Sequence, residues 1–163
     1  MTSTLKVDTI QTTAGAAPTT KDLGFAAGSI VQVATHDHSS STTSTSSGTW
    51  TATGTTLSFT PKFADSTIYI FVKASAEVSG AANTGIGYRI QKDGTTVYDN
   101  DYCLYHSNSN DQRIDQVPII HVEAASNTTA RTYTLDFRLR GGGQTRHNIY
   151  GAPTTMVIHE IAG

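Results

Sequence analysis

Alternation of apolar and polar residues with a period of two recurs along most of this chain, and it restricts the folds that the chain can adopt. The clearest case is RTYTLDFRLR (131–140), where Tyr133, Leu135, Phe137 and Leu139 fall on one side and Thr or charged residues on the other. This period is typical of a strand with one buried face, and the helical period of 3.6 residues is almost absent. The sequence therefore predicts an all-β protein.

Several further strands are predicted, separated by turn residues. TIYIFVKASAEV (67–78) is the most apolar stretch and is expected to be a central strand with Ile68, Ile70 and Val72 inside. Pro118 places its strand at a sheet edge or at a bulge, because proline has no N–H to donate. The remaining expected strands, including a hairpin that turns at the Asp-Gly pair of KDGT, lie at 29–35, 48–61, 86–100, 113–124 and 155–161.

Eight or so short strands at a spacing of about 8–15 residues indicate a β-sandwich, and we expect a jelly-roll-like one. We assign residues 29–163 to this sandwich, closed by TMVIHEI near the end of the chain. Residues 1–28 contain Thr, Ala, Gly and Pro and are predicted to form an extended N-terminal anchor or stalk. The Ser/Thr-rich stretch 42–48 is predicted to be an exposed loop.

Composition excludes several classes of function. Charged residues make up 15% of the 163 residues, and Ser and Thr about a quarter, whereas soluble domains carry about 25% charge. A net charge of −2 without a basic run gives no basis for binding nucleic acid. No apolar run approaches the ~18 residues of a membrane span, and no signal-peptide pattern is seen. The single Cys103 forms no disulfide within the chain, which is compatible with assembly in a reducing cytoplasm.

Leu5, Val7 and Ile10 form a short apolar stripe near the N-terminus. A lone strand of this length does not offset its ordering entropy of about 1–2 kcal/mol per residue. Packing against other copies of the chain buries the stripe, and we therefore predict these residues to act in assembly or anchoring. The alternative is a disordered tail.

Two polar clusters have the residue types of metal sites. His36-Asp37-His38 puts two imidazoles on one face of a strand, but no third ligand can be assigned, and exposed loop histidines are the favoured interpretation. A metal site formed by these histidines on a three-fold axis is the remote alternative. Asp99, Asn100 and Asp101 offer calcium-type oxygens without the spacing of an EF-hand, and a solvated hairpin end is the simpler interpretation. We therefore predict no metal and no cofactor.

The best ligand candidate is YCLYHSNSNDQR (102–113). It combines aromatic rings with amides, as sugar recognition requires, although core tyrosines followed by a polar loop give the same pattern. The predicted receptor-binding residues are Tyr102, Tyr105, His106, Asn108 and Asn110.

No catalytic constellation is found in the sequence. The three glutamates, Glu77, Glu123 and Glu160, form no acid/base motif, and Cys103 has no identifiable histidine partner. GGGQTRHN (141–148) opens no predicted helix, so it is interpreted as a turn and not as a phosphate-binding loop. We do not expect an enzyme.

Three segments resemble tail-fibre-type virion proteins of tailed bacteriophages, especially those of marine cyanophages. STLKVDTIQTTAG resembles the start of those fibres, GSIVQVAT with GTWTATGTTLSFTP resembles the first strands of their terminal domain, and TTMVIHEIAG resembles their closing strand. The resemblance implies a homotrimer in the virion, attached to other virion proteins through the N-terminal segment and released by lysis.

The expected function is therefore that of a short trimeric tail fibre or spike that contacts the host surface, where a glycan is the expected partner. Two alternatives stay open. One is a capsid decoration or head fibre protein, since the chain is short for a tail fibre. The other is a monomeric carbohydrate-binding module, for which the N-terminal segment is only a linker.

Overall fold

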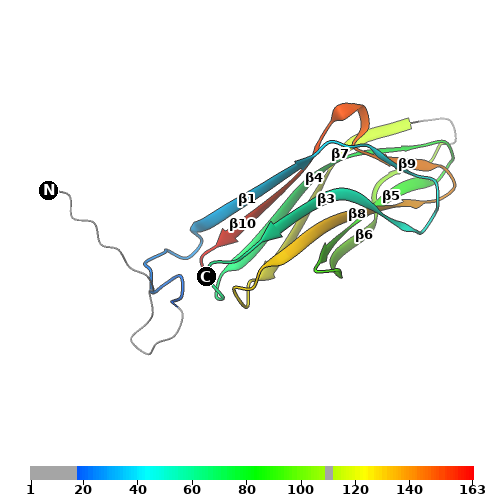
Figure 1. The fold of residues 1–163 in the computed structure, drawn as a ribbon. Coiled ribbons are helices and arrows are strands. Elements are labelled where there is room, and N and C mark those ends of the chain that lie inside the picture. The colour runs from blue at the N-terminus through cyan, green and yellow to red at the C-terminus, as the bar shows by residue number, and fades with distance from the viewer. Residues whose placement is uncertain (1–17, 109–111) are drawn as a thin grey trace.

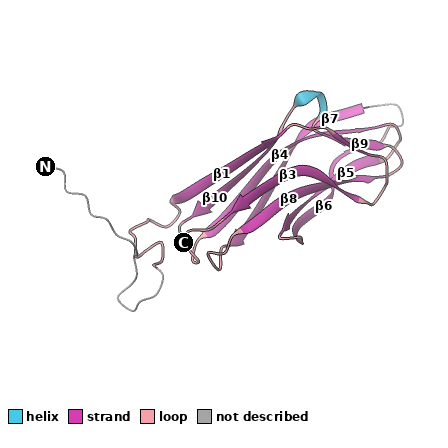
Figure 2. Ribbon diagram, viewed as in Figure 1, coloured by secondary structure: helices cyan, strands magenta, loops and turns pink. Residues whose placement is uncertain are grey.

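A computed structural model describes residues 18–108 and 112–163. The described residues form strands joined by turns, with one short 3-10 helix (Figure 2). The elements are β1 Ile30–His38, β2 Thr42–Ser44, β3 Trp50–Phe59, β4 Thr67–Ser79, β5 Thr84–Lys92, β6 Thr95–His106, β7 Gln112–Ala124, β8 Arg131–Arg140, β9 Gln144–His147, η1 Ile149–Gly151 and β10 Thr154–Ile161. The all-β prediction is confirmed.

Two antiparallel sheets pack face to face (Figure 1). In sheet A, β4 is central: residues 67–73 pair with β10 on one side and with β7 on the other, and residues 76–79 pair with β9. β1 pairs with β10, and β2 with β9, at the outer side of the sheet. Sheet B has the order β3-β8-β5-β6. The predicted β-sandwich is therefore present.

The chain crosses repeatedly between the sheets. Without the short strands β2 and β9 of sheet A, the two sheets have the orders β1-β10-β4-β7 and β3-β8-β5-β6. Successive strands of these eight then lie in opposite sheets except for the β5–β6 hairpin, which is the strand order of a jelly roll. The first and last long strands, β1 and β10, are neighbours, as expected for a sandwich closed by its final strand. Within the described ranges, no helix is long and apolar enough to cross a membrane.

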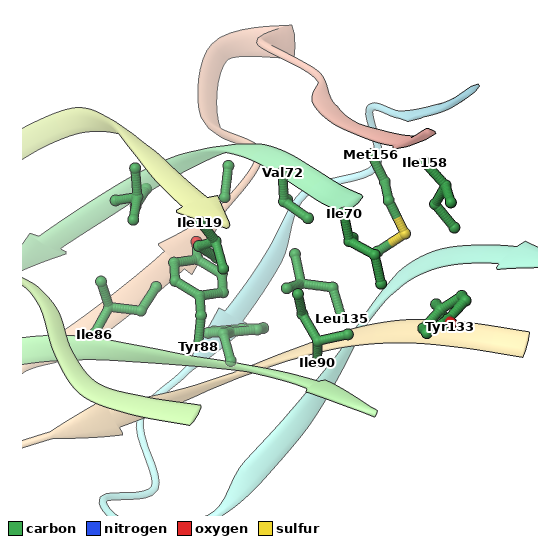
Figure 3. Close-up of a cluster of buried hydrophobic side chains, with 14 of the residues drawn as sticks. Ile70, Val72, Ile86, Tyr88, Ile90, Ile119, Tyr133, Leu135, Met156 and Ile158 are labelled. Carbon is green, nitrogen blue, oxygen red and sulfur yellow. The ribbon is translucent and has the colours of Figure 1, made fainter. Parts of the chain in front are cut away.

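The core lies between the sheets and is formed by the side chains at every second position of each strand, which point inward. Figure 3 shows side chains from both sheets meeting there. Tyr133, Leu135, Phe137 and Leu139 are all buried, as their alternation predicts. The same holds for the inward residues predicted for β4, which are Ile68, Ile70 and Val72.

Two local predictions about turns and edges are also confirmed. Asp93 and Gly94 have φ of 49° and 81° at the β5–β6 turn, the positive values that a tight hairpin needs. β7 pairs with β4 alone among the described strands, so Pro118 lies on an edge strand, where a residue without an N–H is tolerated.

The region from His36 to residue 48 differs from the prediction. β1 extends to His38, and Thr42–Ser44 form β2, with Ser44 buried, so this part is not a plain exposed loop. The reason is that threonine favours pleated backbone, and a low-complexity composition did not exclude a short strand.

The part of the N-terminal segment that the structure describes, residues 18–28, packs against one end of the sandwich. Thr20 is buried, and its hydroxyl donates to Asp65 at 3.0 Å. Phe25 meets Phe63 edge to face at 5.6 Å between ring centroids, and the Gly28 N–H donates to the Ala162 carbonyl at 2.9 Å. This connector lies beyond the end of the sandwich at which the C-terminus also lies (Figure 1).

The predicted assembly residues Leu5, Val7 and Ile10 lie outside the described residues. The predicted trimer, and the division of the chain at residues 28 and 29, stay predictions.

At the connector end, the buried carboxylate of Glu160 ties β10 to the chain between β3 and β4. It accepts the N–H of Lys62 and of Phe63, both at 2.9 Å, and the Ser66 hydroxyl at 2.7 Å. Gln32 of β1 also donates to it, at 2.6 Å. Charge-assisted bonds from several directions stabilise a buried carboxylate that is otherwise costly.

We predict that Glu160→Ala lowers the free energy of unfolding by about 3 kcal/mol, because it leaves the buried N–H of Phe63 and the partly buried N–H of Lys62 without their acceptor. Urea titration followed by circular dichroism measures the change. Asp99→Ala, at an exposed position, is the matched control and should change the value by less than about 0.5 kcal/mol. An equal effect of the two variants contradicts this role of Glu160.

Candidate functional site

Tyr102 and Tyr105 lie together on the outer face of sheet B. Tyr102 is 54% exposed and Tyr105 39%, and their rings meet edge to face at 5.8 Å between centroids. The Tyr105 hydroxyl donates to Asn83 Oδ1. Two exposed aromatic rings beside an amide can stack on a sugar and hydrogen-bond its hydroxyls.

Gly85 leaves room for the Tyr102 ring. A Cβ on Gly85 would lie 2.7 Å from Cδ1 of Tyr102, so the ring occupies the space that a side chain would fill. At Gly87, a Cβ would lie 2.8 and 2.9 Å from the carbonyl oxygens of Asn100 and Asp101. The two glycines of β5 therefore let β6 and its tyrosine lie close against the sheet.

Arginines and a tryptophan extend this surface across sheet B. The Arg138 guanidinium lies 4.2 Å from the Trp50 ring centroid, and Arg140 lies 5.8 Å from that of Tyr102. Both arginines form ion pairs with Asp101. Cation–π contacts and ion pairs hold these flat groups in fixed positions. We call Trp50, Tyr102, Tyr105, Arg138 and Arg140 the tyrosine surface.

The tyrosine surface lies at the end of the sandwich opposite to the connector. Gly85, opposite Tyr105 in the ladder, is the second residue of β5, whereas Lys92, opposite Tyr133, is the last. Tyr133 pairs with Leu57 near the end of β3, and Phe63, shortly after β3, donates its N–H to Glu160 at the connector end. The tyrosine surface and the connector therefore lie at opposite ends of the sandwich along its long axis, which Figure 1 shows by the course of β5 and the place of the connector.

The structure does not bring all five predicted receptor residues together. His106 is buried, on the side of β6 opposite to the neighbouring Tyr105, so it does not contribute to the tyrosine surface. Asn108 is exposed just after β6. Asn110 lies outside the described residues.

The two clusters considered for metals are placed differently from the expectation. His36 and His38 do share one face, with ring centroids 6.4 Å apart, but in a strand and partly buried instead of in an exposed loop. Asp99, Asn100 and Asp101 lie inside β6 and not at a hairpin end. Within residues 18–108 and 112–163, no group of three potential ligands is close enough for a metal ion.

The candidate acid and base groups are held in structural contacts. Glu123 binds Lys92 at 2.6 Å and accepts the Tyr133 hydroxyl. Although burial alone raises the pKa of Glu123, these bonds leave it lowered. Burial raises the pKa of the Cys103 thiol, which makes it a poorer nucleophile.

One histidine is buried in the core as a neutral hydrogen-bonding group. His147 lies 3.1 Å from the Tyr88 hydroxyl at Nδ1 and 3.1 Å from the Thr154 hydroxyl at Nε2. Thr154 donates its only proton to Asn148, so it accepts from Nε2–H, and Nδ1 accepts from Tyr88. Burial, with the charge of His38, lowers the pKa of His147 to about 3.

The outer face of sheet A carries a surface that sequence reasoning missed. Two rows of side chains cross the strands β1, β10, β4 and β7 of this sheet, since residues paired across a β-ladder point to the same side. The rows are Val33–His159–Tyr69–Val122 and Thr35–Val157–Phe71–Ile120. Their apolar members are exposed: Val33 51%, Phe71 37%, Ile120 58% and Val122 45%. We call these eight residues the apolar face.

The sequence contained a signal for this face. In TIYIFV, the outward residues Tyr69 and Phe71 are large and aromatic, and the inward residues are aliphatic. A strand with large apolar side chains on both sides is typically buried on both faces. The tyrosine surface was harder to find in the sequence. Arg138 and Arg140 are two residues apart in β8 and point to the same side, but Trp50 belongs to β3, far away in the sequence.

Comparisons with known proteins assign no family. No protein-family profile and no curated protein matches the chain. Among solved structures, it is similar to a structure of the Gx strain of infectious bursal disease virus, at 12% identity and a TM-score of 0.46. It is also similar to a mutant VP2 protein of the same virus in T=1 particles, at 16% identity and a TM-score of 0.46. The two matches cover 81% and 82% of this chain, whereas this chain spans only 37% of the length of each of those proteins.

We predict that Gly87→Ala lowers the free energy of unfolding more than Gly85→Ala does, by about 1–3 kcal/mol. A new Cβ at residue 87 lies 2.8 and 2.9 Å from backbone oxygens, whereas at residue 85 the tightest contact is with the Tyr102 ring, which can rotate away, and the nearest backbone oxygen is 3.2 Å away. Urea titration compares the two variants. Equal losses contradict the assignment of Gly85 as a site for the Tyr102 ring.

His147 should make stability depend on pH. Its pKa is lowered in the folded protein from an ordinary value of 6.5 to about 3, so the unfolded chain binds a proton first as the pH falls. The contribution is complete above pH 6.5 and is lost as the pH falls toward 3, amounting to about 2 kcal/mol by pH 5. His147→Gln should reduce the pH dependence between pH 7.5 and 5 by that amount in urea titrations. An unchanged dependence contradicts the assignment.

Proposed function

We propose that this protein is a virion structural protein of a tailed bacteriophage, a short trimeric tail fibre or spike. It is attached through its N-terminal segment and presents the sandwich outward. Its role is architectural and not catalytic, and the far end of the sandwich contacts a glycan of the host surface.

The observation that carries this proposal is the separation of the connector and the tyrosine surface along the sandwich. Residues 18–28 pack at one end, and Tyr102 and Tyr105 are exposed at the other. A subunit fixed at its N-terminal end therefore presents two exposed aromatic rings, an amide and two arginines at the far end of the sandwich. The resemblance of the opening, early and closing segments to tail-fibre-type proteins supports the same function.

A capsid decoration protein is the second candidate, and a monomeric carbohydrate-binding module is the third. The apolar face favours an assembled protein over the monomeric module, because exposed apolar patches of this kind mark interaction sites.

Light scattering of the purified full-length chain tests the oligomeric part of the proposal. We expect a mass near three times 17.3 kDa. A mass of one chain at every concentration overturns the trimer and favours the monomeric module.

Binding of the full-length protein to a panel of bacterial surface polysaccharides tests whether the tyrosine surface binds a glycan. We expect Tyr102→Ala to weaken binding by about ten- to a hundredfold, since stacking on one aromatic ring contributes about 1–3 kcal/mol. Thr134→Ala, on the outer face of sheet B away from the tyrosines, is the matched control and should bind as the parent does. Binding that survives loss of Tyr102 and Tyr105 together contradicts a role of this surface.

A further inference from the structure

The two outer faces of the sandwich differ in chemistry. On sheet B the outward residues of β8 and β5 include Thr134, Asp136, Arg138 and Arg89, with Arg89 and Asp136 paired at 2.7 Å. On sheet A the two central rows hold no carboxylate, ammonium or guanidinium group. The apolar face is therefore a specific property of sheet A, and contact with water is unfavourable for it.

Shallow grooves cross the apolar face from the connector end. One is lined by Gly28, Tyr69, Phe71, His159 and Ile161. The next is lined by Phe71, Lys73, Pro118, Ile120, Thr155 and Val157. The two grooves share Phe71, whose ring lies 5.4 Å from that of His159. Together they form a path that starts at Gly28, where the connector joins β1, and continues toward Pro118.

The size of the face limits what can cover it. The part of sheet A that carries the apolar face and its two grooves is four strands wide, at about 4.8 Å per strand, and seven paired residues long, at about 3.3 Å each, which gives a flat area of about 440 Å². A stable interface between two globular surfaces buries about 800 Å² on each partner. The face is therefore small for a dimer made by sheet packing alone, but its length of about 23 Å fits an extended segment of seven residues.

The chain contains such a segment outside the described residues. Residues 1–17 include Leu5 and Val7, which share one side of an extended chain, with Lys6 and Asp8 on the other. Seventeen residues extend to about 56 Å, more than twice the length of the face. Ile10 has the opposite parity to Leu5 and Val7, so an extended segment presents apolar side chains to both sides and needs apolar surface on both.

We propose that residues 1–17 of a neighbouring copy of this chain bind across the apolar face, with Leu5 and Val7 in the grooves on either side of Phe71. The opposite parity of Ile10 favours a neighbouring copy over the same molecule, because a segment between two copies has a surface on each side. Pro118 in the β7 edge favours binding on the face over addition of a strand at that edge. This inference rests on the proposed function, since it takes assembly of several copies as given.

Photo-crosslinking of the full-length protein tests the proposal. In one variant the photo-reactive residue benzoylphenylalanine replaces Ile120, and in a second variant it replaces Val122. Two variants are used so that poor folding of one does not decide the result. The matched control carries it at Thr134, on the outer face of sheet B. Each protein is assembled from an equal mixture of ordinary and isotope-labelled chains, irradiated and digested with trypsin. Mass spectrometry then identifies the partner peptide, and light scattering gives the mass of each sample.

We expect cross-links from positions 120 and 122 to the peptide of residues 7–21, with mixed isotope labels, and none from position 134. Cross-links to that peptide within one molecule, cross-links to the sandwich of another copy, or no cross-links each overturn the proposal. In these cases a trimeric mass leaves the proposed function standing, whereas a monomeric mass overturns the proposed function itself. We also expect Val7→Asp to reduce the cross-linked fraction, because a carboxylate is unfavourable in an apolar groove.

Discussion

Strand β4 is the element on which the rest of sheet A depends. It pairs with β7 along its full length on one side, and with β10 and then β9 on the other side. Its inward side chains, from Ile68 to Val78, form the floor of the core. A shift of β4 by one residue would move this whole set to the outside. The register of β4 therefore fixes the core, and through β10 it also fixes β1.

The sequence predicted those parts of the structure that depend on local pattern. The period of two in 131–140 gave the buried set of β8, and the Asp93-Gly94 pair gave the hairpin, because both signals lie within a few neighbouring residues. It also predicted that Pro118 lies at a sheet edge or a bulge, and the structure has it on the edge strand β7. The strand β2 was missed since its three residues lie in a tract of Ser and Thr, where composition hides a short strand.

The candidate sites were harder to predict, because they are made by pairing between distant strands. Tyr102 and Tyr105 were found in one segment, but Trp50, Arg138 and Gly85 join them only through the ladders of sheet B. His106 was included because it follows Tyr105 in sequence, yet successive residues of a strand point to opposite faces. The apolar face likewise comes from four strands, and only β4 signals it by being apolar on both sides.

The pairing of β1 with β10 has a mechanical consequence for a subunit that is fixed at its N-terminal end and bound at its tip. A pull between these ends runs along the axis of β1, and the hydrogen bonds of an antiparallel ladder are perpendicular to that axis. The ladder is therefore loaded in shear, with all its bonds resisting together, and does not open one bond at a time. The contacts of the connector, Thr20 with Asp65 and Phe25 with Phe63, lie before β1 and are few. They yield first and lengthen the tether, while the sandwich stays intact.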